Sequence, residues 1–500
     1  MGDKMKILKI IISLILVLII SAAVVPASTS AKTSGGIIYP FISDVKTYYS
    51  EVEQYIASQL KQQKTQIDIS VYGVSTKDII YIYRSIMFDY PEIFYVNSAY
   101  IPYQYDKSTD TVAILKPQYI FDTGKIPSYI NKFNNAANKL ISGIDSSYSD
   151  FQKALVLHDR IALNCKYKEE NLKSFTAYNV IVAGKGICEG YCRAYSYLLS
   201  LVGVDSKCLN NEAKQHCWSL VKLGGSWYHV DVTSDDPMPD TPGYVRHKFF
   251  LISDSKLKSY KSTYHSGYTS DITYSSAYCC SSSKYNGSFF RNIISQIAVY
   301  KGKYYYFDNK YKKKYSALMR KSGSSKKRIK VIKDVWKYSN GTKVGKSYCN
   351  LCESNGKYLL FNGKRSLYRY NLSTGKTKRV LKLPESKSKN FVGVKFSGSA
   401  VYTNRKNKNL TKTKLSKMIK FSGSKYTVLP LLKYSSKTLK KGKSFKLKVY
   451  YGSGKITYKC SNKKIAKVTS KGKVKALKKG SCTITAVKNG KKLKCKIKVK

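Results

Sequence analysis

The sequence predicts a multidomain protein with an α+β core, a β-rich middle region and a small C-terminal β-sandwich. Its 500 residues exceed what one hydrophobic core usually contains, so several domains are expected. Helical periodicity dominates up to about residue 200, whereas short β-branched and aromatic runs separated by Gly, Asn and Ser dominate after about residue 285. Hydrophobic residues make up 43% of the chain, which favours packed domains over global disorder.

The first 31 residues have the layout of a secretory signal peptide. Lys4, Lys6 and Lys9 precede an apolar run over residues 10–25, and candidate cleavage sites follow Ala27 or Ala31. An uncleaved membrane anchor is the alternative, although the apolar run is short for one. We therefore expect a secreted protein that has no membrane span once the signal peptide is removed.

Four helices are expected before residue 165. Three of them belong to an N-terminal helical segment over residues 32–149, and the fourth begins a core that extends over 150–275. In the first helix, Tyr48, Val52 and Ile56 recur near helical spacing. The expected helices cover residues 44–64, 76–88, 128–142 and 150–164.

A β-rich region is expected over residues 285–430, where three segments resemble one another. Each contains a glycine within an apolar, aromatic run: Gly302, Gly356 and Gly398. A spacing of about 40–50 residues is typical of propeller blades. The pattern is compatible with part of a β-propeller or with a β-meander, and too few copies are visible to close a ring.

The last part of the chain, over residues 435–500, has the pattern of a small β-sandwich. Runs such as 445–449 and 494–499 alternate apolar residues with lysines, which places lysine on one face of a strand. Glycines that predict turns recur at intervals suited to a sandwich, namely Gly442, Gly452, Gly472, Gly480 and Gly490.

The net charge of +61 is carried almost wholly by the second half of the chain. Residues 301–500 contain 59 Lys and Arg against four acidic residues, and no carboxylate side chain occurs from Ser386 to Lys500. A folded polycation needs an anionic neighbour or a large solvated surface. For a secreted protein we expect an anionic cell-wall polymer or polysaccharide as this neighbour, rather than nucleic acid.

Cys188 is the candidate nucleophile. It follows Gly184 and Gly186 and precedes a good helix that stops at Gly203, so it is expected at a helix N-terminus, where the dipole favours a thiolate. The neighbouring glycines would let another backbone or a substrate come close. A buried structural cysteine is the alternative interpretation.

A predicted hairpin supplies the base for this nucleophile. Gly224 and Gly225 separate two strand-like runs, and a two-residue turn makes facing positions sum to 449. Asp231 then faces Trp218 and lies diagonal to His216, within reach of an imidazole–carboxylate hydrogen bond. The register alone therefore predicts an oriented His216–Asp231 pair.

Other histidines, cysteines and acidic residues are further candidates for a catalytic or metal-binding role. His229 shares a face with His216 and is a second candidate base, whereas His158, beside Asp159, is expected to be structural. Cys349 and Cys352 form a CxxC pair for which no second pair stands at zinc-ribbon spacing, so neither a metal nor a cofactor is expected. A proline-rich acidic run favours a capped turn over a calcium site, and its members are Asp235, Asp236 and Asp240.

Three separated motifs resemble the transglutaminase-like superfamily over about residues 150–255. The run GKGICEGYC contains the cysteine that matches Cys188, QHCW contains the histidine that matches His216, and VDVTSDDP contains the aspartate that matches Asp231. The resemblance implies a papain-related Cys-His-Asp site, common in secreted proteins of Gram-positive bacteria. Cys217 departs from the family, which usually has alanine there.

The C-terminal run CSNKKIAKVTSKGKVKALKKGSCTIT resembles the bacterial group-2 immunoglobulin-like domain, a non-enzymatic surface module. Together the two resemblances imply a secreted, wall-associated enzyme that acts on protein or peptide amides. Acyl transfer through a thioester is expected, and the sequence does not separate an amine from water as the acceptor. A cysteine peptidase or amidase with the same three residues, or a non-catalytic wall-attached adhesin, is the alternative.

Overall fold

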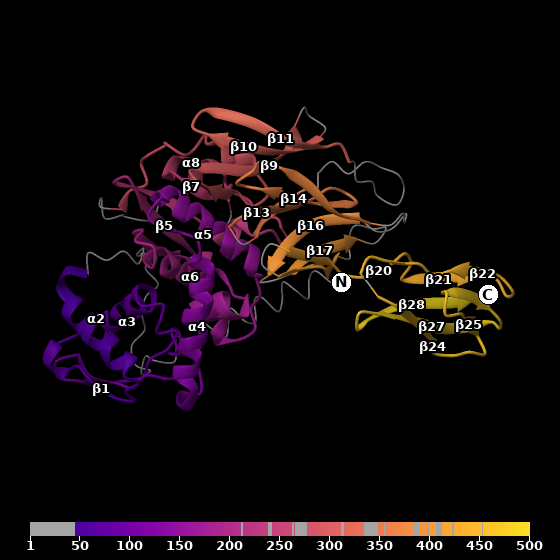
Figure 1. Cartoon of the computed structure of the whole chain (residues 1–500). Helices are drawn as coiled ribbons and strands as arrows, with labels where there is room; N and C mark the ends of the chain where they lie inside the picture. The colour runs from indigo at the N-terminus through magenta and orange to yellow at the C-terminus, as the bar shows by residue number, and fades with distance from the viewer. Residues whose placement is uncertain are drawn as a thin grey trace. The chain divides into compact units, whose positions relative to one another are not determined.

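The computed structural model divides into two compact units, Met1–Asp240 with Val245–Asn292, and Thr241–Tyr244 with Ile293–Lys500 (Figure 1). The structure describes residues 46–500, except 212–213, 239–242, 263–264, 266–277, 312–314, 335–348, 355, 384–389, 398–399, 407–412, 423–424 and 453. The predicted signal peptide and Asp240 lie outside the described residues. None of the helices in the described part of the chain has the length and apolar character needed to cross a bilayer.

The N-terminal part of the first unit combines helices with a small antiparallel sheet. The helices α2 (Lys46–Lys61), α3 (Asp78–Asp89) and α4 (Ile126–Ile141) lie where the sequence periodicity placed them. The sheet was not expected, because its strands are only two to five residues long and give little alternation. Its order is β1 (Ile67–Asp68), β3 (Thr111–Leu115) and β2 (Tyr103–Asp106).

The core of the first unit places two helices beside a four-stranded antiparallel sheet. Helix α5 (Asp150–Asn164) begins with a capping box in which Ser149 and Gln152 bond to each other's backbone N–H groups. Helix α6 (Cys188–Ser200) buries ten of its residues, which include Leu198 and Leu199. The sheet order is β4 (Ser206–Asn211), β5 (His216–Leu223), β6 (Ser226–Val230) and β7 (Phe250–Ile252).

The hairpin of β5 and β6 has the predicted register. Leu223 pairs with Ser226 and Ser219 with Val230, so facing positions sum to 449. Gly224 and Gly225 occupy the turn, and both have positive φ (57° and 82°), a conformation that glycine adopts without strain.

The β-rich region begins with three successive four-stranded antiparallel sheets. Gly302 and Gly356 lie in the first hairpin turns of the first two sheets, and Gly398, outside the described residues, falls between the first two strands of the third. One apolar core joins the first two sheets, for example through Phe307 and Phe361, and another joins the second to the third. The sheets comprise β8 (Ala298–Tyr300), β9 (Lys303–Tyr311), β10 (Tyr315–Ser322) and β11 (Ser325–Ile332); β12 (Leu351–Ser354), β13 (Tyr358–Asn362), β14 (Ser366–Asn371) and β15 (Thr377–Lys382); and β16 (Asn390–Ser397), β17 (Ala400–Lys406), β18 (Thr413–Ser422) and β19 (Lys425–Val428).

The C-terminal part has two main sheets around one apolar core, as its alternating sequence predicted. Val474, Ile484 and Ile497 are at most 1% exposed and belong to this core. One sheet has the order β21 (Ser436–Leu439), β28 (Lys491–Val499), β27 (Gly480–Lys488) and β24 (Ile456–Cys460). The other has the order β22 (Ser444–Lys446), β26 (Lys473–Ala476) and β25 (Ala466–Val468), and β20 (Leu431–Leu432) pairs with β23 (Val449–Tyr450).

Candidate active site

Cys188 is the first residue of α6, as predicted. Ile187 precedes it in an extended conformation and provides no side-chain cap, and the first N–H groups of a helix have no intrahelical partner. These groups and the helix dipole favour negative charge at the sulfur. The thiol is 8% exposed, so it lies at the edge of the packed core rather than in open solvent.

The glycines around Cys188 allow another stretch of backbone to pack against the helix start. A Cβ at Gly190 would lie 2.7 Å from the backbone oxygen of Ser174, and one at Gly186 would lie 2.5 Å from a methyl of Val180. The Ile187 N–H donates to the Ser174 carbonyl at 3.1 Å. These two glycines therefore serve a close backbone approach from within the chain.

His216 begins β5 and lies next to the thiol. Gln215 precedes it with φ of 47°, and the Cys188 sulfur lies 4.0 Å from the Gln215 carbonyl oxygen. The ring is 6% exposed and contacts the Cys188 side chain on one side. On the other side, Nε2 lies 2.8 Å from Oδ2 of Asp231, which leaves Nδ1 for the sulfur.

Asp231 is held rigidly because it is the N-cap of the short helix α7 (Val232–Asp235). Its Oδ1 accepts from the Ser234 N–H at 2.9 Å, and its Oδ2 accepts from the Ser234 hydroxyl at 2.6 Å. Its own N–H donates to the Phe249 carbonyl. At 1% exposure the carboxylate has a fixed direction towards His216.

The charges of this group reinforce one another. Burial by itself lowers the pKa of His216, but the Asp231 carboxylate and the contact with Cys188 outweigh it and raise this pKa to about 10. Burial likewise raises the pKa of Asp231, and the two histidines beside it more than reverse this and bring it below its usual range. The arrangement thus favours an imidazolium next to an ionised carboxylate.

The second histidine on Asp231 is His265, which the sequence reasoning missed. Its Nε2 lies 2.9 Å from Asp231 Oδ2 and its Nδ1 lies 2.8 Å from the Ser262 hydroxyl. The ring is 5% exposed and stacks on Phe249. It comes from a stretch without strand or helix periodicity, so neither register nor spacing pointed to it.

His229, the second candidate base, lies in a different set of contacts. The Trp218 indole N–H donates to His229 Nδ1 at 3.0 Å, which makes Nδ1 an acceptor. His229 Nε2 must then donate to Asp254, at 2.8 Å. Both ring nitrogens of His229 are used in this way, whereas His216 is the histidine that lies beside Cys188.

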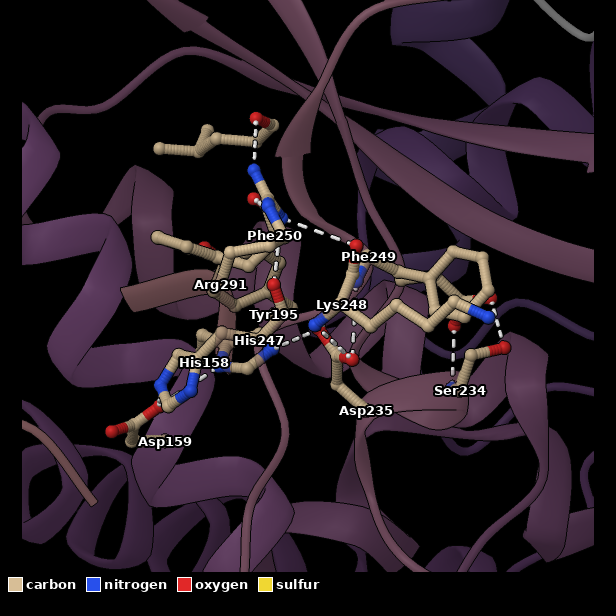
Figure 2. Close-up of polar contacts among 12 residues, drawn as sticks. His158, Asp159, Tyr195, Ser234, Asp235, His247, Lys248, Phe249, Phe250 and Arg291 are labelled. Carbon is tan, nitrogen blue, oxygen red and sulfur yellow. Dashed lines mark hydrogen bonds and ion pairs between the residues drawn. The ribbon is translucent and has the colours of Figure 1, made fainter. Parts of the chain in front are cut away.

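A second buried network holds the far end of α7 (Figure 2). Asp235 accepts hydrogen bonds from the backbone N–H groups of Lys248 and Phe249 and lies 3.3 Å from His158 Nε2. Asp159 lies 2.9 Å from His158 and 3.0 Å from His247. Since Asp231 caps the near end of the same helix, this network fixes the residue that orients His216.

Asp235 and Asp236, two members of the acidic run that follows β6, are held by buried contacts. Asp235 belongs to the network of Figure 2, and Asp236 accepts from the Tyr191 hydroxyl at 2.7 Å. Both are buried, and they lie in and after a capped helical turn, although its cap is Asp231. The described members of the run, Asp235 and Asp236, therefore belong to a capped turn.

Three further thiols share an apolar cluster with Cys188. Burial raises the pKa of Cys192 and of Cys208 well above the usual thiol value, and it raises that of Cys217 to about 12. These thiols are therefore neutral at physiological pH, whereas thiolate is the reactive form. Nucleophilic reactivity in this cluster is expected at Cys188.

Three described groups bring together side chains of the kind that bind metal ions. In each, the histidine nitrogens are within hydrogen-bonding distance of a carboxylate, which accounts for the arrangement. The groups are His158, Asp159 and His247; His216, Asp231 and His265; and His229, Asp254 and Cys280.

Comparisons with known proteins identify two regions of the chain. Residues 134–232 match the family model of the transglutaminase-like superfamily, and residues 431–499 match that of the bacterial Ig-like domain (group 2). No curated protein matches the sequence.

Solved structures resemble the chain only weakly. The crystal structure of a TGase is 10% identical, with a TM-score of 0.20 over 28% of this chain and 45% of that one. The extracellular domain of the putative one component system BT4673 from B. thetaiotaomicron is 10% identical, with a TM-score of 0.20 over 59% and 48% of the two chains. Domains 4 and 5 of the S-layer protein SbsC are 15% identical, with a TM-score of 0.13 over 33% and 92%.

Likenesses of this size carry no argument, and this chain spans less than half of the TGase. The family matches, in contrast, identify two domains of the chain. The chain contains a domain of the transglutaminase-like superfamily at residues 134–232 and a bacterial Ig-like domain of group 2 at residues 431–499.

Proposed function

We propose that the protein is a secreted enzyme that transfers acyl groups from protein or peptide amides through a thioester on Cys188. One observation carries the proposal: a buried imidazole, His216, contacts the Cys188 side chain and lies 2.8 Å from the Asp231 carboxylate. A cysteine nucleophile needs a base within reach and a group that orients this base.

The reaction has two steps. The Cys188 thiolate attacks the amide carbonyl carbon, the C–N bond breaks, and the departing amine takes a proton from the His216 imidazolium. An amine or water then attacks the thioester, His216 accepts its proton, and the C–S bond breaks to restore the thiolate. Asp231 stabilises the imidazolium, and the Cys188 backbone N–H at the helix start is suited to stabilise the oxyanion.

The acceptor separates the main proposal from its alternative. A lysine acceptor gives a cross-link, whereas water gives deamidation of glutamine or cleavage of a peptide bond. The same three residues serve both routes. Acyl transfer is the main proposal because the matched domain belongs to the transglutaminase-like superfamily, and the experiment below separates an amine from water as the acceptor.

Mass spectrometry of a Gln- and Lys-containing protein mixture tests the proposal. The chain is incubated with the mixture beside a Cys188→Ala variant and a Cys208→Ala variant, the latter lacking another thiol of the same cluster. We expect cross-links with wild type and with Cys208→Ala, and none with Cys188→Ala. Deamidation or cleavage that depends on Cys188 would select the hydrolytic alternative, and no product from any variant would leave the adhesin interpretation.

We also propose that the basic half retains the protein at the cell wall through an anionic polymer. Most lysines of the C-terminal domain are exposed, so their charges are accessible to a polymer outside the protein. Retention on wall preparations should fall as salt rises, since exposed charges are screened beyond about 8 Å at physiological ionic strength.

A further inference from the structure

Strand β28 carries a row of four exposed lysines on one face. Lys492, Lys494, Lys496 and Lys498 alternate with buried or half-buried residues such as Cys495 and Ile497, so all four ammonium groups leave the sheet on its outer side. Alternate residues of a strand are about 6.8 Å apart, so the row, here named the lysine ladder, leaves the strand at regular intervals along its length.

Hydroxyl groups border the lysine ladder on both sides. On β21, Ser436 pairs with Lys496 and Thr438 with Lys498. On β27, Ser481, Thr483 and Thr485 pair with Lys498, Lys496 and Lys494. Paired residues of adjacent strands lie on the same face, so the ladder is a central track of ammonium groups between two rows of hydroxyls.

The charge of the ladder has no counterpart within its own domain. Residues 431–500 contain 24 lysines and no acidic residue. Neighbouring ladder residues are about 6.8 Å apart along the strand, less than the Debye length of about 8 Å at physiological ionic strength, so the repulsion between their charges is only partly screened. A bound polyanion would relieve this repulsion along the whole row.

The chemistry of the face narrows the class of partner. Within the described strands, the residues that share this face with the ladder are Ser, Thr, Val487 and Lys459, and none is aromatic. Single-stranded nucleic acids are bound by stacking on aromatic side chains, and protein interfaces are anchored by aromatic and apolar residues. Ammonium and hydroxyl groups instead suit the oxygens of phosphodiesters.

We propose that the lysine ladder binds a linear phosphodiester polymer of the poly(glycerol phosphate) type, extended along β28. Successive phosphates of such a polymer are separated by a three-carbon unit, a spacing of the same order as that of alternate residues on a strand. This inference rests on the proposed anionic wall partner and is independent of the acyl-transfer chemistry.

The opposite sheet of the same domain offers a matched control. Its outer face also carries four exposed lysines, Lys446, Lys467, Lys473 and Lys475, but they are spread over three strands. Replacing the four ladder lysines with glutamine, or these four control lysines with glutamine, removes the same charge from the same domain. The two variants differ in the linear arrangement of the lysines and in the rows of hydroxyl groups beside them.

The affinity of the full chain for fluorescent poly(glycerol phosphate) is measured for wild type and both variants at several salt concentrations. Each lysine–phosphate contact contributes about 0.7 to the slope of log K against log salt for a single-stranded polyanion, so the ladder variant should lose about 3 in slope. It should bind more than about tenfold more weakly, whereas the control variant should lose less than about 1 in slope.

Three outcomes would overturn the proposal. Equal losses in the two variants would mean that net charge alone binds the polymer. Tighter wild-type binding to single-stranded DNA than to poly(glycerol phosphate) would favour a nucleic acid. Absence of wild-type binding would contradict the proposal of an anionic wall partner but would leave the proposed reaction at Cys188 unaffected. Circular dichroism of both variants checks that the sandwich has folded. Free glycerol phosphate should not compete with the polymer for the wild-type protein, because the proposed site binds a row of phosphates.

Discussion

The two units of the molecule differ in where their ionisable side chains lie: the histidines of the first unit are buried, whereas most lysines of the C-terminal domain are exposed. All five histidines of the chain lie in the first unit, each is at most 6% exposed, and each lies within 3.0 Å of a carboxylate oxygen. The C-terminal domain instead holds 24 lysines without one acid, mostly at its surface. Buried ionisable groups need a partner to offset their desolvation, whereas exposed ones need only water.

This contrast determines how each kind of function should respond to substitution. In the first unit, a function depends on single pairs with fixed geometry, so one substitution should remove it. In the C-terminal domain, a function depends on a repeated exposed pattern, so the loss should be graded.

The largest effect is expected from Asp231→Asn. The substitution keeps the shape of the side chain but removes the charge that raises the pKa of His216 to about 10. The acyl-transfer rate constant kcat should fall by about 10²–10⁴, as for other oriented histidine bases. The alkaline limb of the pH–rate profile should also move to lower pH, because the His216 imidazolium then loses its proton more easily.

A pH profile of kcat against the wild type checks this prediction. Asp254→Asn is the matched control, because it removes a carboxylate from His229 rather than from His216. An unchanged alkaline limb in Asp231→Asn would show that Asp231 does not set the charge of the base.

A large effect on stability is expected from Asp235→Asn, in the network of Figure 2. The Asp235 carboxylate accepts from two backbone N–H groups and lies 3.3 Å from His158, and Asp235, His158 and Phe249 are buried. Breaking such a buried ion pair costs about 3–5 kcal/mol. Denaturant unfolding should show a loss of this order, against less than about 0.5 kcal/mol for the exposed control Asp145→Asn.

The same network predicts how stability depends on pH. Burial lowers the pKa of His158, but its hydrogen bonds and ion pairs with Asp159 and Asp235 raise it overall to about 9. Because the folded pKa exceeds the unfolded value near 6.5, the contribution is full below about pH 6.5 and is lost as pH rises through about 9. Its size is about 3 kcal/mol, since one pKa unit corresponds to about 1.4 kcal/mol.

Unfolding of wild type and of a His158→Gln variant at several pH values between 6 and 10 measures this slope. The wild type should lose stability over that range, and the variant should lose less. Identical slopes for the two proteins would show that His158 is not charged in the folded state.

An intermediate effect is expected at His265. Its Nε2 shares Oδ2 of Asp231 with His216, so we expect it to hold the carboxylate in place. His265→Leu should lower kcat about tenfold with little change in KM, because positioning of the base matters mainly in the transition state. His265→Gln, which can place an N–H near the position of Nε2, should restore most of the loss. Equal losses in both variants would assign His265 to packing alone.

The local geometry around the candidate site could be predicted from the sequence because it follows from local rules. The Gly224–Gly225 turn sets the register, which pairs Ser219 with Val230, and His216 and Asp231 then meet just beyond this pair. The helix that follows the glycine-rich run likewise places Cys188 at its N-terminus. Each relation spans few residues, so a spacing argument reaches it.

The rest could not be predicted because it depends on long-range contacts. His265 meets Asp231 across 34 positions, and His247 meets Asp159 across 88. No periodicity links such residues, and only the packed fold brings them together. The short strands β1 and β2 were not predicted for a different reason. Two to four residues give too little alternation of apolar and polar side chains for a strand to be recognised.

The smallest effects should come from the exposed lysines when stability and acyl transfer are measured. Exposed substitutions away from caps, cores and ion pairs usually change stability by no more than about 0.5 kcal/mol each. Replacing the four lysines of the ladder with glutamine removes only like-charge neighbours, so the denaturation midpoint should stay the same or rise slightly. The rate of acyl transfer to a soluble substrate should not change, because the base is built from buried pairs in the other unit. A marked fall in this rate would mean that the surface charge and the buried site are coupled, and the contrast between the two units would then fail.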